Sequence, residues 1–353
     1  MSNKLLSLII PTYNMEKYLP RCLDSVTRED VPDSLEVIVV NDGSKDSSLN
    51  IAREYESKRP DVVRIIDKEN GNYGSCVNAA LKIATGKYIK MLDADDWYDT
   101  DELIKLISGI VNSECDMFVT HYRWEFVSGK ETCIKISDLW SFNEIYDVDK
   151  VFSNTEFFRL QMHQIGYRTQ LLRDIGYVQT EGISYTDAEW TFIPLFHVKN
   201  VVFIDADVYR YYVGRAGQTM DPSVVVKSLS HEVKSLFAML NYKYKHAKDA
   251  ELLPNVKRYL DFRANNRALN LYFNALIYMP NTAFEQFNLK AIDDNLKTIA
   301  LPEYNAIAHY DKRSYLIRRW RRTGHRPNGF VRYFVGKLFS VYSNLKKRWN
   351  VHR

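Results

Sequence analysis

Three aspartates, Asp93, Asp95 and Asp96, lie within four residues of one another in the stretch LDADDW (residues 92–97). Carboxylates repel one another, and a bound divalent cation would relieve that repulsion. Asp93 and Asp95 are two positions apart, so they point to the same side if the backbone is extended. Mg²⁺ and Mn²⁺ prefer hard oxygen ligands, and Mg²⁺ is commonly held by one or two carboxylates together with substrate phosphates. The spacing therefore predicts a cation site that could neutralise a departing diphosphate.

Polar segments also follow three other apolar runs, at residues 11–14 (PTYN), 41–44 (NDGS) and 68–75 (KENGNYGS). The ring of Tyr13 offers a face to a nucleobase, and Asp42 offers an acceptor for a base N–H. The glycines of the last segment permit a close approach of the backbone to a ligand. Each segment alone is also typical of a turn. Together with the aspartates, the segments favour a nucleotide diphosphate as the ligand.

Strand and helix patterns alternate over the first 120 residues, and this alternation places the polar segments in space. It predicts an α/β fold with a mostly parallel sheet that helices cover on both faces. In such sheets ligands bind at the carboxyl ends of the strands. Asn14 is expected to cap the first helix, whose first turn Pro20 makes irregular. We expect strands at residues 5–11, 35–42, 62–66, 87–92 and 116–122.

Two other classes of nucleotide site are disfavoured by missing glycine motifs. A dinucleotide site needs GxGxxG after the first strand, and PTYNME is not that pattern. The chain also has no GxxxxGK[ST] phosphate loop, which argues against an NTPase.

Three longer segments carry a resemblance to a known family. Residues 7–26 (SLIIPTYNMEKYLPRCLDSV), 35–48 (LEVIVVNDGSKDSS) and 84–97 (ATGKYIKMLDADDW), in this order, resemble the nucleotide-binding half of glycosyltransferase family 2. The resemblance is strong over residues 4–125 and weaker to about residue 220. It implies the GT-A fold, an Asp-x-Asp metal motif and sugar transfer from a nucleotide donor with inversion, as in bacterial cell-envelope and capsular polysaccharide enzymes.

The resemblance also implies roles for individual residues. Thr12, Tyr13 and Asp42 would hold the base, while Asp93 would contact the ribose or the metal. Asp95 would be the main metal ligand, and Asp96 would face the donor sugar. The donor-binding residues expected on this basis are Pro11, Thr12, Tyr13, Asn14, Asp42, Asn70, Gly74, Asn78, Asp93, Ala94, Asp96, His163, Arg215 and Gln218.

One position departs from the family's pattern. Many members have an arginine before the asparagine of the third helix, where it supports the nucleotide, whereas this chain has Val77 before Asn78. Lys68, Lys90 or backbone N–H groups around Gly74 could supply the missing positive charge. Val77 itself is expected to pack in the core.

Two further segments have both a functional and a structural interpretation. His163 could reach the donor sugar or the acceptor, but a lone histidine beside apolar residues is usually structural. The stretch YVGRAGQTM (212–220) resembles the family's segment that closes over the diphosphate, with Arg215, Gln218 and Thr219 facing it. It could equally be an ordinary glycine-rich loop.

Asp187 is the expected general base. Inversion requires direct attack by an acceptor hydroxyl, and a nearby carboxylate raises that hydroxyl's nucleophilicity. The stretch EGISYTDAEW (181–190) resembles the family's acidic pair, with Thr186 in place of the usual glutamate. Trp190 could stack on a sugar. Alternatively, Asp187 and Glu189 only occupy the first turn of a helix, where the helix dipole favours acids.

Composition is typical of a folded protein, with 46% hydrophobic and 26% charged residues. The four cysteines have no metal-ligand spacing and are expected to be buried thiols of a reducing compartment. No secretory signal and no apolar run of about 18–20 residues is present, so no membrane span is expected.

The charge is unevenly distributed. Residues 312–353 contain 13 Lys/Arg and no acid, which leaves the first 311 residues with 35 basic and 44 acidic residues, a net charge of −9. A basic amphipathic helix can lie in an anionic membrane interface; alternatively, it docks on the acidic body. Nucleic acid is not an expected partner. The apolar face of this helix would consist of Phe334, Leu338, Val341, Leu345 and Trp349.

We therefore predict an inverting, non-processive hexosyltransferase that uses Mn²⁺ or Mg²⁺ and a nucleotide sugar, with UDP as the expected nucleotide. The acceptor would be a glycan or lipid-linked glycan, and the protein would be cytoplasmic and peripheral at the inner face of the membrane. A sugar-nucleotidyltransferase and a non-catalytic nucleotide-sugar or membrane-binding protein are the alternatives. The expected parts are a nucleotide-sugar half (1–120), an acceptor half (121–223), a helical region (224–311) and a basic tail (312–353).

Overall fold

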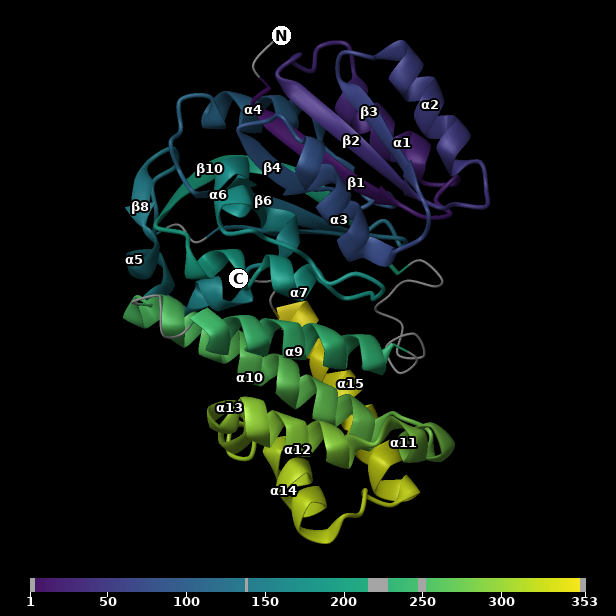
Figure 1. Ribbon diagram of the computed structural model, residues 1–353, viewed down its shortest axis with the longest axis vertical. Helices are drawn as coiled ribbons and strands as arrows, with labels where there is room; N and C mark the ends of the chain where they lie inside the picture. The colour runs from purple at the N-terminus through teal and green to yellow at the C-terminus, as the bar shows by residue number, and fades with distance from the viewer. Residues whose placement is uncertain (1–3, 137–138, 215–227, 247–251, 350–353) are drawn as a thin grey trace. The chain divides into compact units, whose positions relative to one another are not determined.

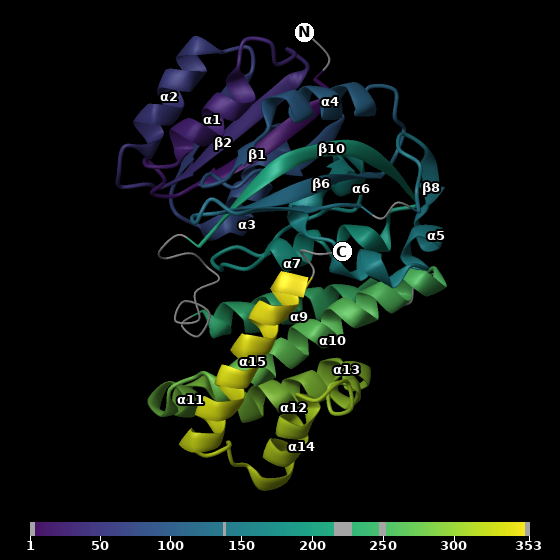
Figure 2. The same ribbon diagram turned by 180° about the vertical axis from the view of Figure 1, so that it is seen from behind.

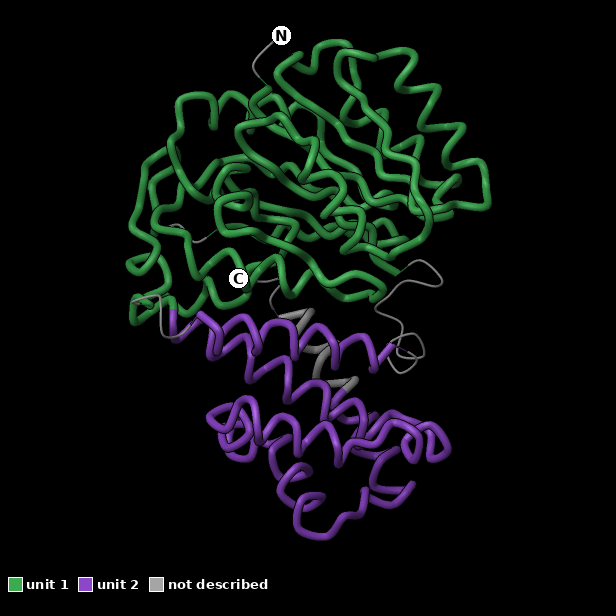
Figure 3. Tube along the Cα trace, viewed as in Figure 1, with its two compact units in different colours: residues 1–215, 252–256 green, residues 216–251, 257–353 purple. Residues whose placement is uncertain are grey.

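The computed structural model describes residues 4–136, 139–214, 228–246 and 252–349. The chain divides into two compact units, one of residues 1–215 with 252–256 and the other of residues 216–251 with 257–353 (Figure 3). The first unit contains the sheet, and the second is helical.

The sheet of the first unit is mixed, with a parallel part at one side. Its strand order is β3-β2-β1-β4-β9-β6-β10-β5, with β7 added to β6 and β8 to β10. The pairs β3–β2, β2–β1, β1–β4 and β6–β10 are parallel, and β9 is antiparallel to both of its neighbours. The strands are β1 (Leu6–Thr12), β2 (Leu35–Asp42), β3 (Val63–Lys68), β4 (Tyr88–Met91), β5 (Trp97–Tyr98), β6 (Met117–Phe126), β7 (Glu131–Ile134), β8 (Ile145–Asp147), β9 (Ile165–Arg168) and β10 (Asn200–Val213).

Helices cover both faces of this sheet, as the alternating pattern predicts. Leu8 and Ile10 of β1 share a core cluster with residues of α1 and α4, whereas Ile9 points away from that cluster. The helix α3 lies in front of the sheet in Figure 1, and α1 and α4 lie in front of it in Figure 2. The helices of this unit are α1 (Leu19–Thr27), α2 (Ser48–Lys58), α3 (Asn72–Ile83), α4 (Thr100–Ile110), α5 (Val148–Phe152), α6 (Thr169–Asp174) and α7 (Asp187–Trp190), with 3₁₀ turns η1 (Thr155–Arg159), η2 (Met162–Gln164) and η3 (Pro194–Phe196).

Sequence patterns give most of these elements, because a buried strand reads as a continuous apolar run. All eight residues of β2 are buried. The expected cap at Asn14 is wrong: α1 begins at Leu19 with Pro20 in its first turn, where a missing N–H is tolerated. Asn14 instead has a positive φ of 53°.

The cysteines agree with the prediction in part. Cys22, Cys76 and Cys115 are buried free thiols, but Cys133 is only half-buried. Its strand, β7, pairs with β6 alone, so it has a neighbour on one side only.

The second unit consists of helices held together by aromatic rings and buried ion pairs. Arg321 binds Asp293 at 2.7 Å, and the hydroxyl of Tyr272 donates to the same carboxylate at 2.6 Å. Lys243 binds Glu303 and Asp261. The helices are α9 (Leu229–His246), α10 (Pro254–Ile277), α11 (Asn281–Phe287), α12 (Leu289–Ile299), α13 (Leu301–Ala306), α14 (Ser314–Thr323) and α15 (Gly329–Trp349). Within the described part of the chain, no helix is long and apolar enough to span a membrane.

Candidate functional site

The carboxyl ends of the parallel strands meet at one edge of the sheet. The strand register pairs Thr12 with Asn41, and Asp42 with Lys68. On the other side of β1, Ile9 pairs with Met91, two residues before Asp93. The prediction that the polar segments share one edge is therefore confirmed.

At this edge Asp42 organises the loop after β3. Its carboxylate is buried and accepts hydrogen bonds from Lys68 Nζ at 2.8 Å and from the Gly71 N–H at 2.9 Å. The side chain of Asn70 donates to the Asp42 backbone carbonyl at 2.9 Å. Asp42 and Asn70 thus form one hydrogen-bonded turn.

The end of β1 leaves one aromatic ring exposed. Tyr13 is 46% exposed, whereas Thr12 is buried and donates its hydroxyl to the carbonyl of Ile10. Pro11 precedes them within β1. Asn14 accepts a hydrogen bond from the Lys45 N–H at 2.8 Å, which joins this loop to the one after β2.

Gly74 and Asn78 of α3 bind another part of the same chain. A Cβ at Gly74 would lie 2.1 Å from the carbonyl oxygen of Thr180. The Asn78 amide donates to the Gln179 carbonyl at 2.9 Å and accepts from the Gln179 N–H at 2.8 Å. The sequence suggested that a ligand approaches the backbone at Gly74. In the structure, the segment that leads to Asp187 occupies this space instead.

The positive charges suggested for the diphosphate are engaged elsewhere. Lys68 Nζ donates to Asp42, the Glu69 carbonyl and Ser75. Lys90 is fully buried and donates to the His163 carbonyl at 2.6 Å, and burial holds the pKa of Lys90 well below its usual value. Val77 is buried, as expected.

Arg21, which the sequence patterns did not single out, is a cation beside the aspartates. Its guanidinium donates to the Asp95 carbonyl at 3.1 Å and lies 3.6 Å from the ring centroid of Trp97. It also lies 4.6 Å from the ring of Tyr212. The only sequence signal for this contact is that Arg21 is a basic residue in the first helix, directly before Cys22.

The aspartates themselves are held by tyrosines from distant segments. Asp96 is fully buried and accepts hydrogen bonds from the Tyr209 hydroxyl at 2.6 Å and the Tyr212 N–H at 2.8 Å. The Tyr73 hydroxyl donates to Asp93 at 2.8 Å. Burial, together with the charges of Asp95 and Asp93, raises the pKa of Asp96 well above its usual value. Ala94 and Asp95, between these partners, are also buried.

His163 lies among the same tyrosines. Its ring stacks on Tyr122 at 5.3 Å and contacts Tyr209 and Tyr211, each at 4.6 Å between centroids. Burial and the charge of Lys90 lower its pKa to about 3, so the imidazole is neutral at pH 7. A set of carboxylates with one neutral imidazole suits a divalent cation, so the residues present fit the implied metal.

Asp187 is the first residue of α7. It is half-buried, and its charge contributes to raising the pKa of Tyr73 and of Tyr211, both of which also respond to Asp93. Asp187 and Asp93 thus act electrostatically on the same two tyrosines. The suggestion that Trp190 stacks on a sugar is wrong, because Trp190 is fully buried against Tyr167.

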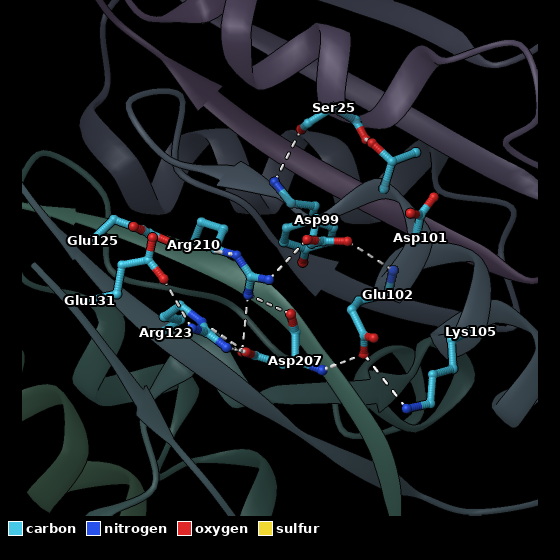
Figure 4. Close-up of polar contacts among 12 residues, drawn as sticks. Ser25, Asp99, Asp101, Glu102, Lys105, Arg123, Glu125, Glu131, Asp207 and Arg210 are labelled. Carbon is cyan, nitrogen blue, oxygen red and sulfur yellow. Dashed lines mark hydrogen bonds and ion pairs between the residues drawn. The ribbon is translucent and has the colours of Figure 1, made fainter. Parts of the chain in front are cut away.

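A charged network fixes the end of β10 that carries Tyr209 and Tyr212. Arg210 bonds to Asp99 at 3.0 Å and to Asp207 at 3.0 Å, and Arg123 bonds to Asp207 at 2.6 Å (Figure 4). The pairing of β10 with β6 shifts register around Asp207. The network therefore stabilises the irregular strand end that places both tyrosines next to Asp96. Arg215, Gln218 and Thr219 lie outside the described residues.

Comparisons with known proteins identify a family match and several relatives. Residues 7–176 match the family described as Glycosyl transferase family 2. The poly(ribitol-phosphate) beta-N-acetylglucosaminyltransferase TarS of Staphylococcus aureus is 27% identical over 310 residues, which are 86% of this chain and 52% of that protein. Glycosyltransferase GlyA of Streptococcus pneumoniae is 29% identical over 181 residues, 51% of this chain and 24% of that protein. The chain thus spans about half the length of TarS.

Solved structures show the same fold. The fragment 1–349 of S. aureus TarS aligns with a TM-score of 0.64 at 20% identity, over 91% of this chain and 92% of that one. The same fragment in complex with UDP-GlcNAc aligns with a TM-score of 0.58.

Proposed function

We propose that this chain, whose residues 7–176 match glycosyltransferase family 2 and whose fold is that of GT-A neighbours, is an inverting, non-processive enzyme that transfers a hexose from a UDP-sugar to a glycan or lipid-linked glycan. The observation that carries the proposal is the set of three carboxylates, Asp93, Asp95 and Asp96, at the carboxyl edge of the sheet, two of which accept hydrogen bonds from Tyr73 and Tyr209. The similarity to proteins named glycosyltransferases favours this function over the nucleotidyltransferase and non-catalytic alternatives.

UDP is the nucleotide that we propose, since the TarS fragment was solved with UDP-GlcNAc and with UDP. The exposed ring of Tyr13 would stack on the base, and Asp42 would mark the base end of the site. Asp95 and Asp93 would hold Mn²⁺ or Mg²⁺, which supplies positive charge to the diphosphate when bound.

Asp187 would act as the general base. Its carboxylate would take the proton of the acceptor hydroxyl while the acceptor oxygen forms a bond to the anomeric carbon. The bond between that carbon and the diphosphate oxygen breaks in the same step, so UDP leaves on the opposite face and the configuration inverts. The half-buried position of Asp187 and its electrostatic effect on Tyr73 and Tyr211 support this role.

Calorimetric titration of UDP, GDP and dTDP, with and without Mn²⁺, tests the donor assignment. Wild type should bind UDP in a metal-dependent manner, and Asp95→Ala should abolish that dependence. Asp101→Ala is the matched control, because the Asp101 side chain is 82% exposed on α4 and should leave binding unchanged. Binding of none of the three nucleotides would overturn the proposed site.

We also propose that the second unit binds an anionic membrane surface, which would bring the enzyme to a lipid-linked acceptor at the inner face of the membrane. Phe330, Phe334 and Leu338 recur every four residues on α15 and are 78%, 54% and 55% exposed. Exposed Lys337 lies on the same helix, and exposed Arg318 and Arg322 lie on α14. Exposed aromatic residues beside basic ones suit the interface of an anionic bilayer.

A further inference from the structure

We infer that His163 is a nitrogen ligand of the divalent cation proposed for Asp93 and Asp95, that Asp96 lies within reach of the same ion, and that His163 makes the site selective for Mn²⁺ over Mg²⁺. This inference rests on the proposed function, since it concerns the cation of the same reaction. It adds a residue to the metal site that the Asp-x-Asp spacing alone does not provide.

The geometry of three side chains carries the inference. One ring nitrogen of His163 and one carboxylate oxygen each of Asp93 and Asp96 lie within 4.8 Å of one another. His163 comes from η2, whereas both aspartates come from the turn between β4 and β5, so two distant segments converge on one point. Two atoms bound to one ion by bonds of about 2.0–2.2 Å lie at most about 4.4 Å apart, so small movements of the side chains would bring all three atoms onto a single ion.

The surrounding residues hold these side chains in place. The ring of His163 is enclosed by Tyr122, Tyr209 and Tyr211, and its backbone carbonyl accepts a hydrogen bond from Lys90 at 2.6 Å. The hydroxyls of Tyr73 and Tyr209 donate to Asp93 and Asp96. Hydrogen bonds of this kind orient metal ligands and raise the affinity of a site.

An unsatisfied atom also points to a ligand. Nδ1 of His163 is buried and has no hydrogen-bond partner among the described residues. Buried polar atoms in folded proteins are normally satisfied. A cation would also offset the repulsion among the neighbouring carboxylates. Mg²⁺ strongly prefers oxygen ligands, whereas transition-metal ions accept imidazole nitrogen, so a histidine in the set favours Mn²⁺.

The test uses the full chain with Mn²⁺ and UDP. Electron spin-echo envelope modulation should detect a ¹⁴N coupling to the bound Mn²⁺ in wild type, which ¹⁵N-histidine labelling changes to the ¹⁵N pattern. His163→Phe keeps a ring between the tyrosines but removes both nitrogens. It should abolish the coupling and weaken Mn²⁺ binding about ten- to hundredfold, while Mg²⁺ affinity changes less.

Tyr122→Phe is the matched control, because it keeps the ring that stacks on His163 and should preserve both the coupling and the affinity. A wild-type complex that binds Mn²⁺ without nitrogen coupling, or equal Mn²⁺ affinity in His163→Phe, would overturn the inference and leave the proposed function intact. Absence of Mn²⁺ binding to wild type in the presence of UDP would instead contradict the metal-dependent function itself.

Discussion

Tyr73 interacts with two carboxylates of the candidate site, Asp93 and Asp187. Burial, the charge of Asp93 and its hydrogen bond, and the charge of Asp187 all raise the pKa of Tyr73 well above its usual value. The phenol therefore keeps its proton at pH 7. Its O–H donates a hydrogen bond to Asp93 at 2.8 Å. A group that holds its proton this firmly cannot accept another from an acceptor hydroxyl. Asp187 is the carboxylate that we propose for this step.

Asp187→Asn should therefore lower kcat about 10²–10⁴-fold, the usual contribution of a general base. The amide preserves size and polarity, so the affinity for UDP and the stability should stay close to wild type. Steady-state kinetics and nucleotide titration check both expectations. Asp174→Asn, an exposed aspartate on α6, is the control and should be fully active. Undiminished turnover in Asp187→Asn would remove Asp187 from the proton transfer.

The reacting residues were predictable from sequence only where residue type and local spacing define them. Asp93, Asp95 and Asp96 stand together in the chain, and Asp42 follows a clear strand. The tyrosine that binds Asp96 is 113 residues away, so the pair forms only through the tertiary fold. Trp190 looked like a sugar-stacking residue because local sequence does not indicate which side of a short helix faces the core.

At the scale of elements, the first four parallel strands follow from their apolar runs, whereas β9 does not. β9 consists of IGYR and lies between β4 and β6, antiparallel to both. A four-residue strand has too short a pattern to be distinguished from a loop. Its position depends on packing, since a Cβ at Gly166 would lie 2.2 Å from the ring of Phe118.

The contact between α3 and the segment before α7 determines where Asp187 lies. Gly74→Ala would place a methyl group 2.1 Å from the Thr180 carbonyl oxygen, so the segment or the helix must move. We expect a loss of about 1–3 kcal/mol in the free energy of unfolding and a lower kcat, because residues 179–187 shift. Urea unfolding and steady-state kinetics measure the two effects.

Gly329→Ala is the control for Gly74→Ala. Gly329 has open space around its Cβ position and no positive φ, so alanine should be tolerated there. Wild-type stability and activity in Gly74→Ala would mean that the segment adjusts without affecting the site.

At the scale of the whole molecule, the division of the chain matches its charge asymmetry. The basic residues of 312–353 all belong to the second unit, and the carboxylate site belongs entirely to the first. Within the second unit, one side of α15 packs inward, where Phe339 meets Phe273 at 4.5 Å and Arg332 donates to the Met279 carbonyl at 2.7 Å. The side with Phe330, Phe334 and Leu338 remains exposed. The amphipathic pattern of the tail therefore predicts a two-sided helix, but only the structure distinguishes its packed side from its open side.

The exposed side of α15 leads to a prediction for the full chain. Phe330→Ser with Phe334→Ser should weaken binding to vesicles of phosphatidylglycerol and phosphatidylcholine by at least about tenfold, since burying one such ring contributes about 1.5–3 kcal/mol. Stability should not change, because both rings are largely exposed. Val178→Ser, an exposed apolar residue of the first unit, is the control.

Vesicle flotation at low and high salt measures the effect. Binding that persists in the double variant would assign the contact to another surface, and binding insensitive to salt would rule out attraction between the basic residues and the lipid headgroups.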